Sequence, residues 1–592
     1  MPPSLRVPTE KVAIAASAAA ATVVGALYAN RRYGVSYDIN QLLAEKSFRK
    51  RFQERVGALG NDMTVFHMFE LADPRAEALW FEGRTWTYGE VLADQTLQHC
   101  VNIANAKILV CTPDVATAIA DLKGEGTPSV VFSLNLSSFP PLQLSSDACT
   151  ASNITQLRYE DLAAIKDDIV LRPKRLLKDV GALIYTSGTS GKPKAVAVKN
   201  FLLVIVSTPA TVDVKNPKTY LPLRTFSCLP LFHATALFTG IYYSTGLSAS
   251  FCLSRKFSAS RFSAQLVECG ATRMLYVGEL CRYLIAAPES PYDRAHKCIS
   301  ATGNGLHRDV WLQFTKRFGI PEIRELYRST EGIAKFDNVG RTTAAAGMVG
   351  FAGPLKLYAE DDTFLVKYDV TTEEPYRDPK TGFCVRAEAG EPGEAIGRVR
   401  SMDYLNDYYG DKAATDLKLI SNVFEKGDVF QRTGDLLVRQ STGWIRFHDR
   451  SGDTFRWRGE NVSASEVREH IGKLEGVQDN SVYAVKLPGY DGQAGAASIT
   501  LTDPSRESEF VDSLYSNLRA SGLALYQMPR LVRFRALIET TATFKKSTGA
   551  LKGLSWNPSA DQPDSVYWLN GDRFSKIDMT AWSDIEAGRA KL

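Results

Sequence analysis

The chain has 592 residues, of which 44% are hydrophobic and 23% charged, and its formal net charge is +4 at pH 7. That length predicts two or more domains with ample core, and that composition is typical of a soluble globular enzyme. This net charge is too small to indicate a nucleic-acid partner, so none is expected. The nine cysteines include no CxxC pair, which argues against a zinc site or a disulfide framework and favours a reducing compartment.

The first predicted element is an uncharged run over residues 12–29. Eighteen helical residues would span about 27 Å, close to the ~30 Å hydrocarbon core of a bilayer. Arg31 and Arg32 follow the run, and an excess of basic residues on that side places the remaining chain in the cytosol. We therefore expect residues 1–35 to form a hydrophobic membrane anchor. A cleaved signal peptide and an alanine-rich surface helix are the alternatives.

The next elements alternate between strands and helices. Residues 78–92 predict a hairpin that leads into a helix, and residues 106–112 and 129–133 predict short buried strands of a parallel sheet. A helix is expected between these strands, and residues 181–185 predict a further strand that enters a loop. Because the alternation continues to about residue 330, layered α/β structure is expected.

The pattern changes in the last third of the chain. Residues 425–448 predict antiparallel strands with breaks at Gly427, Gly434 and Gly443. Residues 463–474, SASEVREHIGKL, predict a capped amphipathic helix that opens a smaller α+β unit. A domain boundary is therefore expected near residues 449–450.

A glycine-rich loop follows the strand at residues 181–185. It reads YTSGTSGKPK and contains hydroxyls, two glycines and two lysines, which suit a polyphosphate. Pro193 stands where a Walker A loop needs Ser or Thr, so this is a phosphate loop of another kind. The candidate nucleotide-binding residues are Tyr185, Thr186, Ser187, Gly188, Thr189, Ser190, Gly191, Lys192 and Lys194.

This motif closely resembles the phosphate loop of the acyl-adenylating superfamily, which includes acyl-CoA synthetases, peptide-synthetase adenylation domains and luciferases. The resemblance extends in order from about residue 60 to the end of the chain. It implies an α/β fold: a large N-terminal adenylating domain of layered α/β subdomains plus a β-subdomain, over residues 60–449, and a smaller mobile α+β C-terminal domain over residues 450–592. It also implies ATP, Mg²⁺ and coenzyme A as cofactors.

Further motifs carry the resemblance along the large domain. LPLFHATAL at residues 229–237 places His233 beside the acyl carboxylate, although a histidine in an apolar run is by itself more often a core residue. ATGNGLHRDVW at residues 301–311 resembles the segment that lines the adenine pocket, with Gly303, Asn304 and Gly305 forming a turn.

ELYRSTEG at residues 325–332 implies that Tyr327 lies against the adenine, Thr330 on a phosphate and Glu331 on Mg²⁺. RTGDLL at residues 432–437 implies that Asp435 accepts both ribose hydroxyls, and Arg450 completes these contacts.

The smaller domain departs from the family at its hinge and matches it at two other motifs. Gly452 occupies the usual hinge position, where relatives often have Asp or Lys, and glycine tolerates large backbone changes. Gly459, Glu460 and Asn461 are placed by the resemblance on the loop that reaches the pantetheine channel. TATFKKSTGALK at residues 541–552 selects Lys545 as the catalytic cation, with Lys546 and Lys552 as alternatives. The implied catalytic residues are therefore Lys545, Glu331, Thr186 and His233.

Several stretches, among them RKFSASRF and GDTFRWRGENVS, resemble the fatty acid transport protein and very-long-chain acyl-CoA synthetase family in particular. Members of that family carry a further segment, on the order of one or two βαβ units, after the position of Gln95. This chain lacks it, which leaves the acyl tunnel and full activity in question. The expected reaction is ATP-dependent conversion of a long or very-long-chain acid to acyl-AMP and then acyl-CoA.

Three alternatives remain open: a CoA ligase dedicated to one bulky non-fatty acid, a membrane protein for fatty acid uptake, and an inactive member. The chain ends Ala590-Lys591-Leu592, a conservative variant of the peroxisomal address Ser-Lys-Leu, although a chance ending also explains it. A peroxisomal or endoplasmic reticulum membrane is expected, with the catalytic part in the cytosol or matrix and a peroxisomal import receptor as a further partner.

Overall fold

The computed structural model describes residues 22–60, 63–88, 108–111, 130–135, 154–158, 175–186, 194–208, 223–370, 372–451, 454–458, 460–538, 551–558 and 564–592. Of the predicted anchor at residues 1–35, residues 22–35 are described, and residues 22–33 form a helix. Within the described ranges, no helix combines the length and the hydropathy that crossing a bilayer requires.

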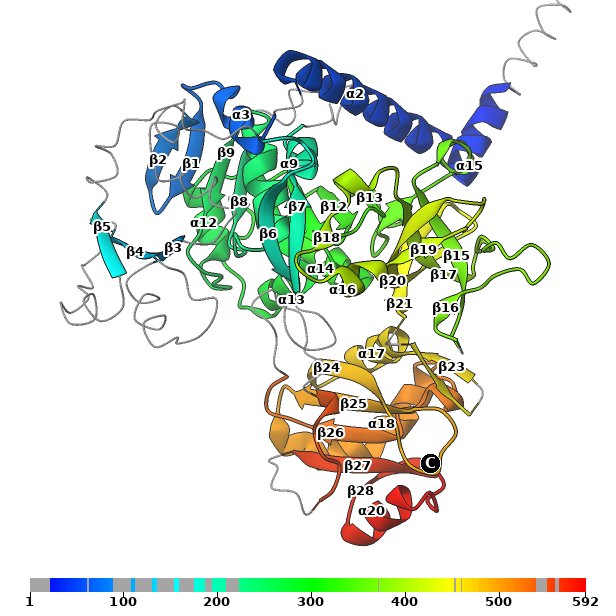
Figure 1. Cartoon of the computed structure of the whole chain (residues 1–592). Helices are drawn as coiled ribbons and strands as arrows, with labels where there is room; N and C mark the ends of the chain where they lie inside the picture. The colour runs from blue at the N-terminus through cyan, green and yellow to red at the C-terminus, as the bar shows by residue number, and fades with distance from the viewer. Residues whose placement is uncertain are drawn as a thin grey trace, which may run out of the picture.

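The centre of the large domain is an eight-stranded sheet in the order β13-β12-β11-β10-β8-β9-β1-β2 (Figure 1). Its strands are β1 Glu77–Phe81, β2 Arg84–Thr87, β8 Arg224–Ser227, β9 Ser250–Leu253, β10 Arg273–Val277, β11 Ser300–Asn304, β12 Glu322–Tyr327 and β13 Phe336–Gly340. The pairings from β1 through β9 to β12 are parallel, and the β1–β2 pair forms the predicted hairpin. The helix expected after this hairpin lies outside the described residues.

Three helices supply the apolar layer against this sheet: α12 Phe262–Glu268, α13 Gly278–Ala286 and α14 Arg308–Phe318. Their buried side chains, among them Leu266, Leu280 and Phe314, share one core with the strand residues Phe226 and Met274. The expected α/β layering is thus confirmed. On the other side of the strands runs a short helical segment of α10 Ala234–Ala236, the π-helix η3 Leu237–Tyr242 and α11 Tyr243–Thr245.

Two smaller sheets flank this layer. Strands β3 Ile108–Cys111, β4 Val130–Asn135 and β5 Ile154–Arg158 are parallel, which confirms the two short strands predicted here. Strand β6 Val180–Thr186 turns back as β7 Lys194–Lys199 in an antiparallel hairpin that the sequence did not predict, and β18 Asp407–Tyr408 pairs with β7. Helix α9 Asn200–Val206 follows directly.

The β-subdomain is a seven-stranded sheet of β14 Gly350–Phe351, β15 Thr363–Asp369, β16 Glu374–Pro375, β17 Pro392–Arg398, β19 Leu419–Ser421, β20 Val429–Arg439 and β21 Trp444–Arg450. The predicted antiparallel strands are confirmed by the β20–β21 pair. Gly427 and Gly443 flank β20, as expected of breaks. Gly434 instead lies inside the continuous strand β20, where its φ of +75° is a conformation that glycine adopts freely.

Helix α2 Val35–Leu59 spans from the β-subdomain to α9 (Figure 1). At its N-terminal end Tyr37 packs on Phe351, with 4.8 Å between ring centroids. At its C-terminal end Phe52 meets Phe201 of α9 edge-on at 5.6 Å. The helix therefore fastens the two subdomains to each other. Short helices complete the domain: α3 Val65–Glu70, α15 Pro354–Ala359, η4 Met402–Tyr404 and α16 Lys412–Asp416.

The last quarter of the chain folds as a separate body in Figure 1. A hairpin of β22 Thr454–Trp457 and β23 Glu460–Ser463 leads into α17 Ala464–Gly472, whose N-cap Ser463 accepts the N–H of Glu466, as predicted. The five-stranded sheet comprises β24 Val477–Val485, β25 Ala494–Leu501, β26 Leu531–Phe534, β27 Ser565–Asn570 and β28 Arg573–Lys576. Helices η5 Pro504–Arg506, α18 Glu507–Ala520, η6 Leu525–Gln527 and α20 Met579–Glu586 accompany it.

Ala590 and Leu592, close to the end of the chain, pack against this domain. Leu592 is 4% exposed and belongs to the apolar core of the domain. The hydroxyl of Tyr490 donates to the carbonyl of Ala590 at 2.8 Å.

Candidate active site

One cleft of about 2690 Å³ extends from the two subdomains of the large domain to the smaller domain. Most of the predicted nucleotide-site residues that the structure describes line it: Thr186, Lys194, His233, Gly303, Asn304, Gly305, Tyr327, Thr330, Glu331, Asp435 and Arg450. Tyr185 is an exception, because it is 65% exposed and outside this lining. Residues 187–193 of the phosphate loop lie outside the described residues.

The two ends of the phosphate loop meet Glu331 through Tyr408. Thr186 donates its hydroxyl to the carbonyl of Lys194 at 3.4 Å, across the β6–β7 hairpin. The ammonium of Lys194 lies 5.2 Å from the ring centroid of Tyr408 and 4.0 Å from Asp411. The hydroxyl of Tyr408 donates to Glu331 at 3.0 Å. The loop and the predicted metal ligand therefore share one wall of the cleft.

Tyr408 was not among the predicted site residues. Burial and the neighbouring Glu331 raise its pKa above the ordinary range, so its hydroxyl keeps its proton and acts as a donor. Its placement follows from the pairing of β18 with β7, in which Tyr408 faces Val196. No local motif marks that pairing, since more than 200 residues separate the two strands.

The carboxylate of Glu331 lines the cleft near Lys194 and Tyr408. Gln431 fixes the Glu331 backbone, because its amide donates to the Glu331 carbonyl at 3.1 Å and accepts from Ile333 N–H at 2.9 Å. In the described part of the chain, no group of three His, Cys, Asp or Glu side chains could enclose a metal. Mg²⁺ often binds one or two carboxylates together with substrate phosphates. The donor set thus fits an ion that arrives with a nucleotide.

The opposite end of the cleft joins three predicted residues. Asp435 and Arg450 are cross-strand partners in β20 and β21, and their side chains are 3.7 Å apart. The hydroxyl of Tyr327 donates to Asp435 at 2.8 Å. Burial first, and the Asp435 charge second, raise the pKa of Tyr327 well above its ordinary value. This end therefore presents a carboxylate, a guanidinium and an aromatic face to a ligand.

The predicted turn of three residues is shorter in the structure. Gly303 and Asn304 complete strand β11, and only Gly305 leaves it, with φ of +78°. The carboxylate of Glu325, 2% exposed, holds this turn because it accepts the backbone N–H groups of Gly305 and Leu306. The strand therefore continues two residues further than the glycine pattern indicated.

Glu325 is also bound by a buried tyrosine. The hydroxyl of Tyr276 donates to Glu325 at 2.5 Å. Burial raises the pKa of Glu325 to about 8, although its three donors oppose that change. Sequence analysis missed both residues, since a buried carboxylate that holds a turn has no motif of its own.

His233 lies at the start of the α10–η3–α11 segment, which packs against the eight-stranded sheet. It caps α10, where its Nδ1 accepts the N–H of Thr235 at 3.4 Å. Phe238, Thr239 and Tyr243 line the same cleft further along this segment. A ligand that starts at His233 can therefore follow η3 into the domain.

The smaller domain closes the cleft with α17. Arg468 lies 2.6 Å from Nε2 of His307, and a guanidinium only donates, so this nitrogen accepts. Burial and the Arg468 charge lower the pKa of His307 to about 4. Lys552 also lines the cleft, whereas Glu460 and Asn461 do not. The predicted residues Gly452, Gly459, Lys545 and Lys546 lie outside the described residues.

Comparison with known proteins agrees with this geometry. The sequence model of the AMP-binding enzyme family matches residues 90–355. Long-chain fatty acid transport protein 2 of Rattus norvegicus is 34% identical over 490 residues, which cover 82% of this chain and 75% of that protein. The medium/long-chain-fatty-acid–CoA ligase FadD6 of Mycobacterium tuberculosis is 32% identical and covers 82% and 74%.

Solved structures show the same fold. O-succinylbenzoate coenzyme A synthetase from Bacillus subtilis, in complex with ATP and magnesium ion, superposes with a TM-score of 0.59 at 18% identity. The match covers 83% of this chain and 99% of that one. The predicted fold class, with a large N-terminal and a smaller C-terminal domain, is confirmed by such neighbours.

The fold and the cleft define an AMP-binding, adenylate-forming enzyme. Within that class, the chain belongs to the AMP-forming acyl-CoA ligase family that contains the long-chain and very-long-chain fatty acid transport proteins. The prediction of an acid–thiol ligase is thereby confirmed, and its alternatives, a ligase dedicated to a non-fatty acid or an uptake protein, are not favoured.

Proposed function

We propose that this enzyme joins a long or very-long-chain carboxylic acid to coenzyme A through an acyl-adenylate. The observation that carries the proposal is the contact chain Lys194–Tyr408–Glu331, which unites the phosphate loop and the predicted metal ligand in one cleft. The fatty character of the acid is supported by the named relatives.

Residue roles follow from the two ends of the cleft. Asp435 accepts the ribose hydroxyls, Arg450 supports it, and the ring of Tyr327 lies against the adenine. At the other end, Lys194 and the loop at residues 186–193 bind the phosphates. Mg²⁺ would be held by Glu331, and when bound it neutralises charge on the phosphate oxygens.

The reaction then needs no covalent enzyme nucleophile. In the first half-reaction, the carboxylate oxygen of the acid attacks the α-phosphorus of ATP and pyrophosphate leaves. Cationic groups that face the α-phosphate, Lys194 and a lysine of the C-terminal motif, offset the charge that builds there. In the second half-reaction, the thiolate of coenzyme A attacks the acyl carbon and AMP leaves.

Two further proposals concern the smaller domain and the membrane. We infer that rotation near Gly452 exchanges the lysine motif for the loop at residues 457–461 between the two half-reactions. Membrane attachment through residues 12–29 is supported by the apolar composition of that run. Removal of residues 1–29 should release the protein from sedimented membranes, at the peroxisome or endoplasmic reticulum.

An exchange assay tests the catalytic proposal. The purified chain, incubated with labelled pyrophosphate, ATP, Mg²⁺ and a fatty acid, should form labelled ATP. Glu331→Gln and Lys194→Met should each lower that rate at least about 100-fold. Lys412→Met is the matched control, because Lys412 is 86% exposed at its side chain and pairs with Asp416 on the same helix.

No exchange with any acid in the unmodified chain would refute adenylation and support an inactive member. Single alanine variants of Lys545, Lys546 and Lys552 then identify the catalytic lysine. The variant that loses exchange while it retains ATP binding marks the catalytic position. Loss of exchange in Lys552→Ala alone would overturn the assignment of Lys545.

A further inference from the structure

Arg273, the first residue of β10, is a buried cation that lines the cleft. Arg273 as a whole is 4% exposed to solvent. Its Nη2 donates to the carbonyl of Thr239 in η3, and its guanidinium lies 4.6 Å from the ring centroid of Tyr243. Nε is buried without a hydrogen-bond partner, and no described carboxylate forms an ion pair with this arginine. Arg273 therefore carries a charge that the described protein does not neutralise.

Strand register places this cation on the sheet face toward η3. Arg273 lies opposite Ser300 on β11, and two residues further Leu275 lies opposite Thr302. Residues two apart on a strand share a face. A Cβ on Gly240 of η3 would come 3.2 Å from Leu275. The face that Arg273 shares with Leu275 is therefore the one that packs against η3.

A neutral polar group lies beside the cation on this face. The hydroxyl of Thr302 is buried, lines the cleft and has no hydrogen-bond partner in the described structure. Buried polar atoms are normally satisfied. Both Arg273 and Thr302 thus have hydrogen-bonding capacity that a ligand in the cleft could use.

The nearest acidic residue on the face is already shared. Glu322 pairs with Arg324 at 2.5 Å and with Arg341 at 2.6 Å. Glu322 is therefore already shared by two other guanidinium groups. Burial, and to a smaller extent the Arg324 charge, lower the pKa of Arg273 to about 10, so it remains charged at neutral pH. An uncompensated buried charge is costly, which makes this a site for an anion.

The position of the site indicates which anion it takes. Thr239, the backbone partner of Arg273, follows His233 by six residues along the α10–η3 segment, a rise of roughly 9 Å at helical spacing. An acid whose reacting carboxylate is at His233 would therefore extend along η3 toward Arg273. An unsubstituted alkyl chain would place apolar carbon against a buried guanidinium, which offers it no favourable contact.

We propose that Arg273 binds a second carboxylate at the far end of the acid, so that the substrate is an ω-carboxy fatty acid and Arg273 is a specificity-determining residue. This rests on the proposed function, because it assigns the far end of the acid that is activated there. The Thr302 hydroxyl donates a further hydrogen bond to the same carboxylate. In this proposal Arg273 contacts the substrate but does not contact the atoms that react.

Matched acids test the proposal. Acyl-CoA formation is measured with dicarboxylic acids (suberic, dodecanedioic, hexadecanedioic and octadecanedioic), with the ω-hydroxy acids of the same lengths, and with the unsubstituted acids. We expect the highest kcat/KM for a dicarboxylic acid. Arg273→Met, which retains the aliphatic stem, should lower kcat/KM for that acid at least about 30-fold, the equivalent of about 2 kcal/mol. It should leave the unsubstituted acid unchanged or improve it.

Two controls separate recognition from structure. Arg341→Met removes a cation from the same cleft, but its side chain is 56% exposed and already paired, so the preference for dicarboxylic acids should change by less than about 3-fold. Arg273→Lys retains the charge and should recover part of the preference. If Arg273→Met instead lowers kcat/KM for all acids alike, Arg273 only supports η3 and the proposal is overturned.

The outcome also separates this inference from the proposed function. Equal or better use of the unsubstituted acid by the unmodified enzyme overturns the dicarboxylate assignment alone, while acyl-CoA synthesis stands. A best substrate among the ω-hydroxy acids likewise overturns the anionic assignment. Absence of exchange with every acid in the panel overturns both.

Discussion

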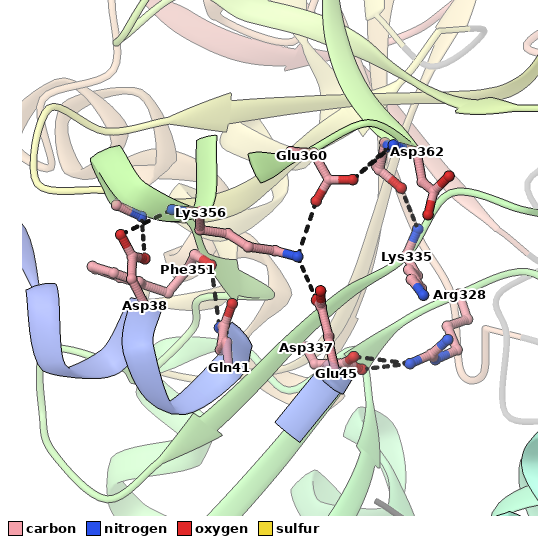
Figure 2. Close-up of polar contacts among 12 residues, drawn as sticks. Asp38, Gln41, Glu45, Arg328, Lys335, Asp337, Phe351, Lys356, Glu360 and Asp362 are labelled. Atoms are coloured by element: carbon pink, nitrogen blue, oxygen red, sulfur yellow. Dashed lines mark hydrogen bonds and ion pairs between the residues drawn. The ribbon is translucent and has the colours of Figure 1, made fainter. Parts of the chain in front are cut away.

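Substitution of Asp38 by alanine should release α2 from the β-subdomain. Asp38 is fully buried and accepts the N–H groups of Gly353 at 2.8 Å, Leu355 at 3.0 Å and Lys356 at 3.1 Å, so it caps α15 from another helix (Figure 2). Alanine leaves these three donors without that acceptor. Water reaches some of them once α2 moves, which limits the loss.

The magnitude follows from these contacts. Loss of an N-cap carboxylate costs about 0.5–2 kcal/mol, and one buried donor that water does not reach adds about 1–3 kcal/mol. We expect a total of about 3 kcal/mol. Gln41, which donates to the Phe351 carbonyl at 3.3 Å, and the Glu45–Lys356–Glu360 ion pairs hold the same junction (Figure 2), so the remaining contacts should keep the large domain folded.

Hydrogen exchange is the appropriate assay, since it resolves local opening from global unfolding. In Asp38→Ala, the amides of α15 and of the first half of α2 should exchange about 100-fold faster, and those of the eight-stranded sheet should not change. Glu54→Ala is the control, because Glu54 lies on α2 with 61% side-chain exposure and a 3.8 Å pair to Lys50. Equal protection of α15 in both variants would refute the claim that Asp38 fastens α2.

Three further predictions concern the nucleotide end of the cleft and its closure. Gly278→Ala would place a Cβ 1.8 Å from the carbonyl oxygen of Gly305, so it should displace the turn, cost about 1–3 kcal/mol and raise KM for ATP more than KM for the acid. Because the pKa of Glu325 is raised from 4.5 to about 8, the folded state binds this proton more tightly, and the free energy of unfolding should fall as pH rises through that range. Glu325→Gln should remove this component, on the order of 5 kcal/mol, from the pH profile of chemical denaturation; an unchanged profile would contradict it. Arg468→Ala removes the contact with His307, worth about 1 kcal/mol, and should change the ratio of exchange rate to thioester-formation rate about 5-fold, whereas a constant ratio would show that the contact does not bias the domain orientation.

Motifs that are short and continuous were predictable from the sequence. The strand before the phosphate loop, the β20–β21 pair and the capped helix at residue 463 each depend on neighbours close in the sequence, within one strand, hairpin or helix turn. Family resemblance then supplied the proposed partners of Asp435, and β-sheet register places Arg450 opposite it. Sequence order and local propensity were sufficient because these contacts are local or belong to one hairpin.

Other site features depend on distant pairing and could not be predicted. Tyr408 reaches Glu331 only because β18 adds to the hairpin that ends in Lys199. The position of helix α2 across the two subdomains was not predicted from the sequence, since its residues were assigned to the region between an anchor and a domain. Gly303 was predicted in a turn because glycine permits one, but here it allows close approach: a Cβ would lie 2.0 Å from the Tyr276 carbonyl oxygen.

Arg450 is followed by the domain junction and preceded by Asp449, which is 1% exposed and accepts the hydroxyls of Ser463 at 2.8 Å and Ser465 at 3.1 Å. Consecutive residues of one strand thus belong to two different attachments, one at the proposed nucleotide pocket and one at the start of α17. A nucleotide bound there as proposed would, through its contact with Arg450, also shift the free energy of the arrangement of the smaller domain. By reciprocity, each orientation of that domain would then have its own affinity for ATP and for AMP, and strand β21 would couple nucleotide release to domain orientation.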